Sequence, residues 1–127
     1  MNDKDTTIQK LKDLADKFVK DRGWGKHHNS KNLAVSIAIE AVELMEHFQW
    51  DEYRWDYNKK DLGEELADVI NYCLYFAIEN KIDIAKAVEV KFKKAAKKYP
   101  VKVFNSKKDD AKDYWEIKKK YRSKKIK

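Results

Sequence analysis

Two pairs of acidic residues interrupt segments whose apolar residues otherwise repeat with the period of a helix. The first pair is Glu40 and Glu43, and the second is Glu65 and Asp68. Residues three positions apart share one face of a helix, so the two members of each pair project together. Carboxylates among core residues are costly to bury unless they are paired or bind a cation. The pattern therefore predicts consecutive helices that place four oxygen ligands around a hard metal ion.

The residues around these carboxylates favour a site over a solvated surface. Acidic residues at this spacing often lie on an exposed helix face, and charged residues make up 40% of the chain, so one pair alone would favour exposure. The second pair and the apolar neighbours on both faces instead favour a metal site. Those neighbours are Leu33, Ile37, Leu44, Val69 and Phe76. His47 and Tyr72 follow Glu40 and Glu65 by seven positions, nearly two turns, and return to the same faces.

The chain has few residues that break helices, with 3 Gly and 1 Pro among 127 residues. We therefore expect an all-α fold with a four-helix core that carries the two acidic pairs on consecutive helices. The core is predicted over residues 1–105, and a Lys-rich tail or polar helix over 106–127. The predicted helices cover about 8–22, 32–48 or 50, 61–79 and 83–99, with a polar helix over 109–121.

Helix-capping patterns set these predicted boundaries. Thr6 and Gln9 have the spacing of a capping box for the first helix, and Asp61 and Glu64 resemble one for the third. Gly23 fits a left-handed residue at the end of the first helix. The second helix is apolar over more than half its circumference, so we expect it to be central or to contact another subunit.

The loop before the second helix carries an aromatic ring, two imidazoles and two cations: Trp24, Lys26, His27, His28 and Lys31. Adjacent histidines without a cysteine partner are a weak signal for zinc. A loop that binds a ligand by stacking and by charge is the better interpretation.

The net charge of +7 is concentrated near the C-terminus, since residues 106–127 carry +6. Such a tail is most often a solvated feature, and attraction to phosphate or nucleic acid is the sharper possibility. A single cysteine, Cys73, allows no internal disulfide and is compatible with a reducing cytoplasm. No signal-peptide pattern follows Met1, and the apolar run over 69–78 is too short to span a membrane, so we expect a cytoplasmic location.

Four converging carboxylates suit a particular chemistry. They would repel one another and raise their own pKa values, and bound Mg²⁺ or Mn²⁺ would remove the repulsion. All-oxygen ligands favour these hard ions, and Mg²⁺ commonly pairs carboxylates with substrate phosphates. The cations Lys31 and Lys91 would suit the phosphates of a nucleotide, and the rings of Trp24, Trp50 and Tyr72 its base.

Several motifs together extend over about residues 8–101. They are Trp24, the stretch 28–33 (HNSKNL), the run 40–50 (EAVELMEHFQW), the run 64–72 (EELADVINY), Lys91 and the stretch 98–101 (KYPV). In these motifs the sequence resembles the all-α nucleotide pyrophosphohydrolases of the MazG type, specifically the small single-domain members similar to dCTP pyrophosphatase. The combination of ExxE and ExxD with these flanks is specific, whereas ExxE alone is not.

The resemblance implies Mg²⁺-dependent hydrolysis of a (deoxy)nucleoside triphosphate to the monophosphate and pyrophosphate, as clean-up of the nucleotide pool. It implies metal ligands at Glu40, Glu43, Glu65 and Asp68, and a homodimer or a tetramer built from dimers. By the same analogy Trp24 and Trp50 flank the base. The candidates for phosphate or sugar contacts are His28, Lys31, Tyr72 and Lys91. Glu43 and Glu46 are the candidates for the group that accepts a proton from water.

The sequence departs from the dCTP pyrophosphatase pattern at two positions, with Ala15 in place of a histidine and Ala95 in place of an asparagine. Preference for cytosine is therefore not implied. Three alternatives stay open. A di-iron bundle would need Glu-x-x-His, and no histidine follows a glutamate by three. The others are a nucleic-acid-associated helical module that uses the basic tail, against which no recognised nucleic-acid-binding motif is visible, and a catalytically silent MazG-like domain.

Overall fold

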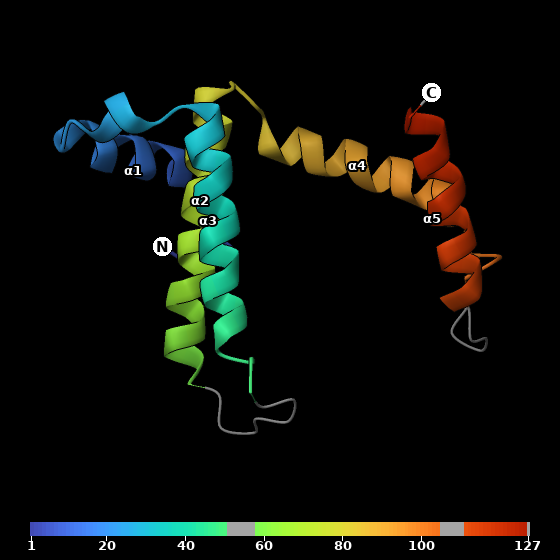
Figure 1. The fold of residues 1–127 in the computed structure, drawn as a ribbon. Coiled ribbons are helices and arrows are strands. Elements are labelled where there is room, and N and C mark those ends of the chain that lie inside the picture. The colour runs from blue at the N-terminus through green and yellow to red at the C-terminus, as the bar shows by residue number, and fades with distance from the viewer. Residues whose placement is uncertain (51–57, 105–110, 127) are drawn as a thin grey trace. The chain divides into compact units, whose positions relative to one another are not determined.

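The computed structural model describes residues 1–50, 58–104 and 111–126, and every regular element in these ranges is a helix (Figure 1). The elements are α1 (Ile8–Asp21), the 3₁₀ turn η1 (Trp24–His27), α2 (Ser30–Glu46), α3 (Lys59–Glu79), α4 (Ile84–Lys98) and α5 (Ala111–Ile126). The all-α prediction is confirmed. Among the helices in these ranges, none combines the length and the apolar character needed to cross a membrane.

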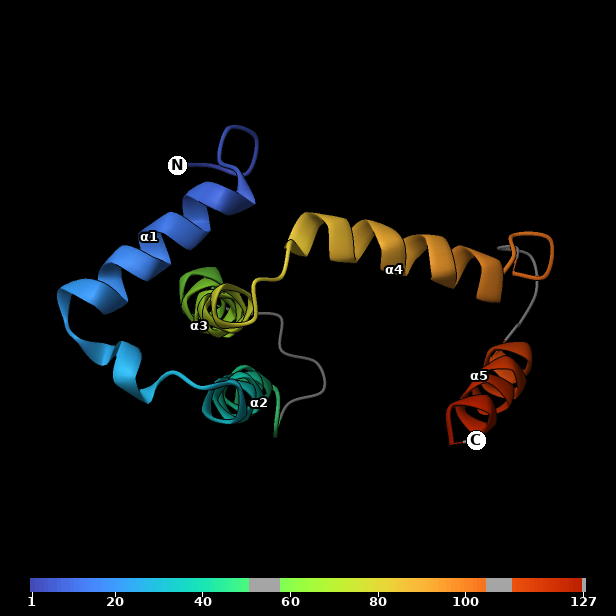
Figure 2. The ribbon, with the colours of Figure 1, turned by 90° about the horizontal axis from the view of Figure 1, so that it is seen from above.

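The chain divides into two compact units, Met1–Ile84 and Ala85–Lys127. In the first unit α2 and α3 run antiparallel and side by side, while α1 crosses the pair and packs on α3 (Figures 1 and 2). The buried apolar side chains lie where α1 and α2 pack on α3: Ala15 and Val19 of α1, Leu33 of α2, and Leu74 and Ala77 of α3. Because Leu33 is near the start of α2 and Leu74 is near the end of α3, the core occupies one end of the pair.

The first helix confirms one predicted terminus and corrects the other. The side chain of Thr7, not Thr6, caps α1 by accepting a 3.1 Å hydrogen bond from the Lys10 amide. Thr6 Oγ1 instead accepts from the amide of Asn2 at 3.1 Å, and the Gln9 side chain donates to Asp13, so the predicted capping box does not form. Gly23 adopts the predicted left-handed conformation, with φ of 63°, and its amide donates to the Lys20 carbonyl at 3.1 Å.

The next two helices begin earlier than predicted. Asn29 Oδ1 accepts from the Asn32 amide at 2.8 Å, so α2 starts at Ser30, and it ends at Glu46, short of Phe48. Asn58 caps α3 by accepting from the Lys60 amide at 3.1 Å. The prediction that Asp61 and Glu64 cap this helix is therefore wrong, because the helix has already begun at Lys59.

The second unit holds α4 and α5. Aromatic contacts join the end of α4 to α5: the rings of Tyr99 and Tyr114 stack at 5.3 Å, and the Lys98 ammonium lies 4.9 Å from the Tyr121 ring. The helix α5 begins at Ala111 and continues beyond the predicted end at residue 121. Residues 85–127 contain 17 Lys and Arg against five Asp and Glu, a net charge of +12, and the rest of the chain therefore carries −5.

Candidate metal centre

Three acidic side chains converge between α2 and α3. One carboxylate oxygen each from Glu40, Glu43 and Glu65 lies within 4.8 Å of the other two. One helical turn separates Glu40 from Glu43, and the antiparallel packing brings Glu65 of α3 opposite them. Ligand oxygens about 2.1 Å from a shared octahedral cation are at most about 4.2 Å apart, so this group needs little adjustment to hold one.

Glu40 is the member of the group with the most perturbed electrostatics. Burial raises the pKa of the Glu40 carboxyl, and a side-chain hydrogen bond with Glu43 and the negative charges of Glu43, Asp68 and Glu65 raise it further. Its Oε2 atom is buried and accepts no hydrogen bond within the described part of the chain. A buried acceptor without a partner costs about 1–3 kcal/mol. A cation would satisfy this oxygen and offset the repulsion, so these residues fit a divalent metal.

Asp68 stands apart from this close group. It follows Glu65 by three residues on α3, is exposed, and is not among the three residues whose oxygens approach within 4.8 Å. Its charge still contributes to the raised pKa of Glu40, so it belongs to the same electrostatic environment. The structure thus brings three of the four predicted ligands together, and the assignment of Asp68 stays a prediction.

An open hollow of about 350 Å³ adjoins the carboxylates and is lined by Glu43, Glu46, His47 and Glu65. Both predicted proton acceptors, Glu43 and Glu46, therefore lie on its wall. His47, which caps the C-terminus of α2, places its Nε2 atom 3.4 Å from Oε1 of Glu65. The seven-residue spacing in the sequence predicted that His47 shares a helix face with Glu40. Sequence reasoning did not assign His47 to the site, although this spacing was a signal for it.

Two predicted substrate residues from the loop before α2 pack elsewhere in the first unit. The ring of Trp24 lies edge-on to Phe18 at 5.7 Å, and the ring of His28 lies 4.8 Å from that of Tyr75. Tyr75 follows Glu65 by ten residues, which is about 15 Å along a helix axis. These two side chains therefore lie toward the core end of the helix pair rather than beside the carboxylates.

The other four predicted substrate residues are dispersed. Tyr72 is half-buried on α3 and contacts Tyr75 edge-on at 5.7 Å. Lys31 is exposed in the first turn of α2, and Trp50, after α2, is 87% exposed. Lys91 is exposed on α4 in the second unit, and its predicted contact with the site stays a prediction.

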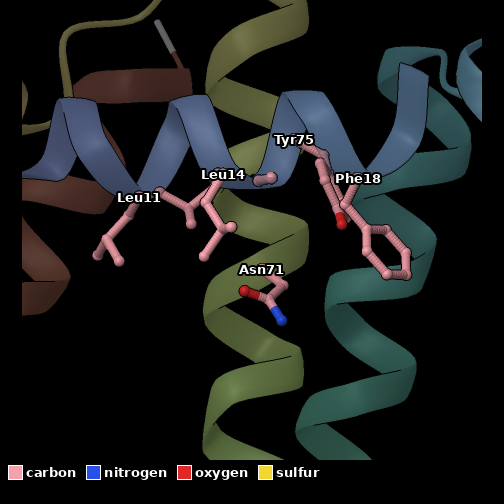
Figure 3. A pocket seen from close by; sticks show the side chains of 7 residues that line it. Leu11, Leu14, Phe18, Asn71 and Tyr75 are labelled. Atoms are coloured by element: carbon pink, nitrogen blue, oxygen red, sulfur yellow. The ribbon is translucent and has the colours of Figure 1, made fainter. Parts of the chain in front are cut away.

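A second hollow, of about 270 Å³, lies between α1 and α3 and was not predicted. Figure 3 shows Leu11, Leu14 and Phe18 projecting from α1 beside Asn71 and Tyr75 of α3. The wall is mainly apolar, and burial raises the pKa of the Tyr75 phenol. The apolar stripe of the first helix was visible in the sequence, whereas its incomplete coverage by α3 depends on the packing angle.

Comparison with known proteins relates the chain to a family and to several named relatives. The sequence model of a family described as the MazG-like family matches residues 35–122. Bovine dCTP pyrophosphatase 1 is 31% identical over 102 residues, which are 75% of this chain and 60% of that protein. The human dCTP pyrophosphatase 1 is 29% identical over 107 residues, covering 79% and 63% of the two proteins. The chain thus spans about 60% of the length of these curated relatives.

A solved structure supports the same grouping. The crystal structure of a pyrophosphatase from Archaeoglobus fulgidus superposes with a TM-score of 0.70 at 37% sequence identity. The superposition covers 79% of this chain and 98% of that one, so it includes nearly the whole of the archaeal protein.

Proposed function

The chain belongs to the MazG-like family, and we propose that it hydrolyses a (deoxy)nucleoside triphosphate to the monophosphate and pyrophosphate. The observation that carries this proposal is the convergence of Glu40, Glu43 and Glu65 between α2 and α3. The names of the mammalian relatives and of the archaeal neighbour support a pyrophosphatase activity. Clean-up of the nucleotide pool is the role we propose for it.

The proposed cofactor is Mg²⁺, for which Mn²⁺ can substitute, held by Glu40, Glu43, Glu65 and Asp68. When bound, the ion supplies Lewis-acid polarisation of phosphate oxygens and neutralises their charge. An all-carboxylate ligand set suits these ions better than zinc or copper. The buried Oε2 atom of Glu40, which has no hydrogen-bond partner among the described residues, supports this assignment.

The carboxylates also carry the proposed proton transfer. Glu43 and Glu46 line the open hollow, so either can accept the proton of a water that attacks the α-phosphorus. The α–β phosphoanhydride bond breaks as the new P–O bond forms, and pyrophosphate leaves. Positioning and electrostatic stabilisation account for most catalysis of phosphoryl transfer, which suits a site with few other reactive groups.

The proposed substrate contacts are Trp24 and Trp50 for the base, and His28, Lys31, Tyr72 and Lys91 for the sugar and phosphates. In one chain Trp24 precedes α2 and Trp50 follows it, and the 17 residues of α2 separate them by about 25 Å along the helix axis. We therefore propose that two copies of the chain contribute to one pocket, so that the Trp24 ring of one copy and the Trp50 ring of the other flank the base. Ala15 lines the hollow between α1 and α3, and we assign no preference for cytosine.

A second copy of the chain is the partner we propose for α2, in a homodimer or homotetramer. Leu33 is buried against the rest of the unit, but Val35, Ile39 and Val42 lie on the other side of α2 and are each about half exposed. A helix that is apolar on both sides is typically covered on both. We propose a cytoplasmic location, where the exposed thiol of Cys73 stays reduced.

The proposal is tested by incubating the full chain with a panel of natural and modified nucleoside triphosphates and Mg²⁺, with separate measurement of pyrophosphate and orthophosphate. We expect pyrophosphate and a nucleoside monophosphate in equal amounts, and no reaction when EDTA removes the metal. Orthophosphate as the first product would show that a different bond is cut. An inactive chain that still binds nucleotide would favour the catalytically silent alternative.

The charge distribution favours one further candidate function, binding of a polyanion such as nucleic acid by the second unit. Its net charge of +12 contrasts with −5 on the rest of the chain. Binding of this kind weakens steeply with salt. Fluorescence anisotropy of a labelled oligonucleotide over a range of salt concentrations tests it, and the absence of binding even at low salt would exclude it.

A further inference from the structure

We infer that His47 is a positioning residue, which orients the Glu65 carboxylate for cation binding; this inference rests on the proposed function. The contact joins two helices, since His47 caps the end of α2 and Glu65 lies in the second turn of α3. The Nε2 atom of His47 lies 3.4 Å from Oε1 of Glu65, and the two side chains are only 28% and 26% exposed.

The geometry explains why such a residue is useful here. The terminal torsion of a glutamate side chain has a broad energy minimum, so Glu65 alone would sample many orientations of its carboxylate plane. A donor on Oε1 fixes that plane and leaves Oε2 available to a cation. Carboxylates that bind metals are commonly held by a hydrogen bond from a neighbouring residue in this way.

The surroundings make His47 the suitable donor. The other residues that line the hollow, Glu43, Glu46 and Glu65, are acidic and accept hydrogen bonds when they are ionised. Among the described residues that line the hollow, the imidazole is the group that can donate one. Donation requires only the tautomer with hydrogen on Nε2, so the role needs no change in the charge of His47.

The test measures Mn²⁺ affinity of the full-length protein without substrate, from the electron paramagnetic resonance signal of free Mn²⁺. The variants are His47→Leu, which removes the donor, and His47→Gln, whose amide nitrogen can replace it. His27→Leu is the matched control, because His27 is an exposed histidine in η1, outside the acidic group. Circular dichroism checks that each variant keeps its helices.

We expect His47→Leu to weaken Mn²⁺ binding by about 10–100-fold, which is typical for loss of a residue that supports a metal ligand. We expect the Mn²⁺ affinity of His47→Gln to stay within about threefold of the wild-type affinity, because the glutamine amide retains a hydrogen-bond donor to Glu65. His27→Leu should bind as the wild type does. If His47→Leu loses helicity, His47→Phe, which keeps a planar ring without a donor, takes its place.

Two results would overturn the inference. Wild-type affinity in His47→Leu would show that Glu65 needs no such support. Equal losses in His47→Leu and His47→Gln would show that the imidazole acts in some way other than by N–H donation. Failure of the wild-type chain itself to bind Mn²⁺ would instead contradict the proposed metal centre, so the two failures are distinguishable.

Discussion

One carboxylate oxygen of Glu40, on α2, lies within 4.8 Å of one of Glu65, on α3. The two residues are 25 positions apart in the sequence and meet because the helices pack antiparallel. Burial raises the pKa of Glu40, and the charges of its acidic neighbours add to this effect. The site therefore destabilises the metal-free fold when Glu40 is ionised, and a bound cation should remove that cost.

The first prediction concerns the pH dependence of stability without divalent cations. Because the folded-state pKa of Glu40 is raised, the folded chain holds this proton more tightly than the unfolded chain does. The contribution of Glu40 to the free energy of unfolding is therefore greatest below the ordinary glutamate pKa of about 4.3, and falls as pH rises through the folded-state pKa.

Urea denaturation of the wild type and Glu40→Gln, from below the ordinary glutamate pKa up to neutral pH, isolates the effect of the Glu40 carboxyl. The free energy of unfolding of the wild type should fall relative to that of the variant as pH rises, and excess Mg²⁺ should reverse the fall. A constant difference between the two proteins at all pH values would contradict the prediction.

The second prediction is that Glu40→Gln separates stability from activity. Replacing the ionised carboxyl by an amide removes repulsion, so the Tm at neutral pH without metal should rise above that of the wild type. Turnover should fall roughly 100-fold or more, because a group that stabilises developing charge is lost. Differential scanning calorimetry and pyrophosphate release measure the two effects. Full activity in this variant would refute the assignment of Glu40.

Asp68 supplies the third prediction, since it lies outside the close group of three carboxylates. We expect Asp68→Asn to lose turnover by roughly 100-fold while keeping its helical circular-dichroism signal, because a second cation contact from α3 is removed. Steady-state kinetics at saturating Mg²⁺ measure it. Retention of most activity would mean that Glu40, Glu43 and Glu65 suffice to hold the metal for turnover.

The fourth prediction concerns the exposed apolar side of α2. Ile39 is 52% exposed in the single chain, on the side of the helix opposite the buried Leu33. If a second copy covers this side, Ile39→Lys buries a charge in the interface and should shift the protein to monomer. Light scattering after size-exclusion chromatography measures the mass. Gln9→Lys, at an exposed position of α1, serves as the control, and equal masses for all three proteins would exclude this interface.

The central part of the site was predictable from the sequence because helical spacing alone determines which residues share a face. Glu40 and Glu43 had to project together, and the apolar Leu33 and Ile37 showed which side of α2 faces the protein. The apolar surroundings predicted for Glu40 and Glu43 agree with the structure, since Leu33 is buried and Ile37 is half-buried.

Helix ends and contacts between helices were less predictable for physical reasons. Two adjacent threonines can both cap a helix, and the turn at Asn2 that engages Thr6 left Thr7 to cap α1. The contacts of His28 with Tyr75 and of His47 with Glu65 depend on how the helices are rotated against each other. Periodicity within one helix does not determine that rotation.

The most direct test of the proposed reaction is hydrolysis of a nucleoside triphosphate in H₂¹⁸O with Mg²⁺, followed by phosphorus NMR. Labelled phosphorus signals shift measurably, so the spectrum identifies which phosphorus was attacked. We predict ¹⁸O in the nucleoside monophosphate, unlabelled pyrophosphate as the other product, and loss of both products in Glu65→Gln. Label in pyrophosphate or orthophosphate, or unchanged turnover in Glu65→Gln, would contradict attack at the α-phosphorus by this carboxylate site.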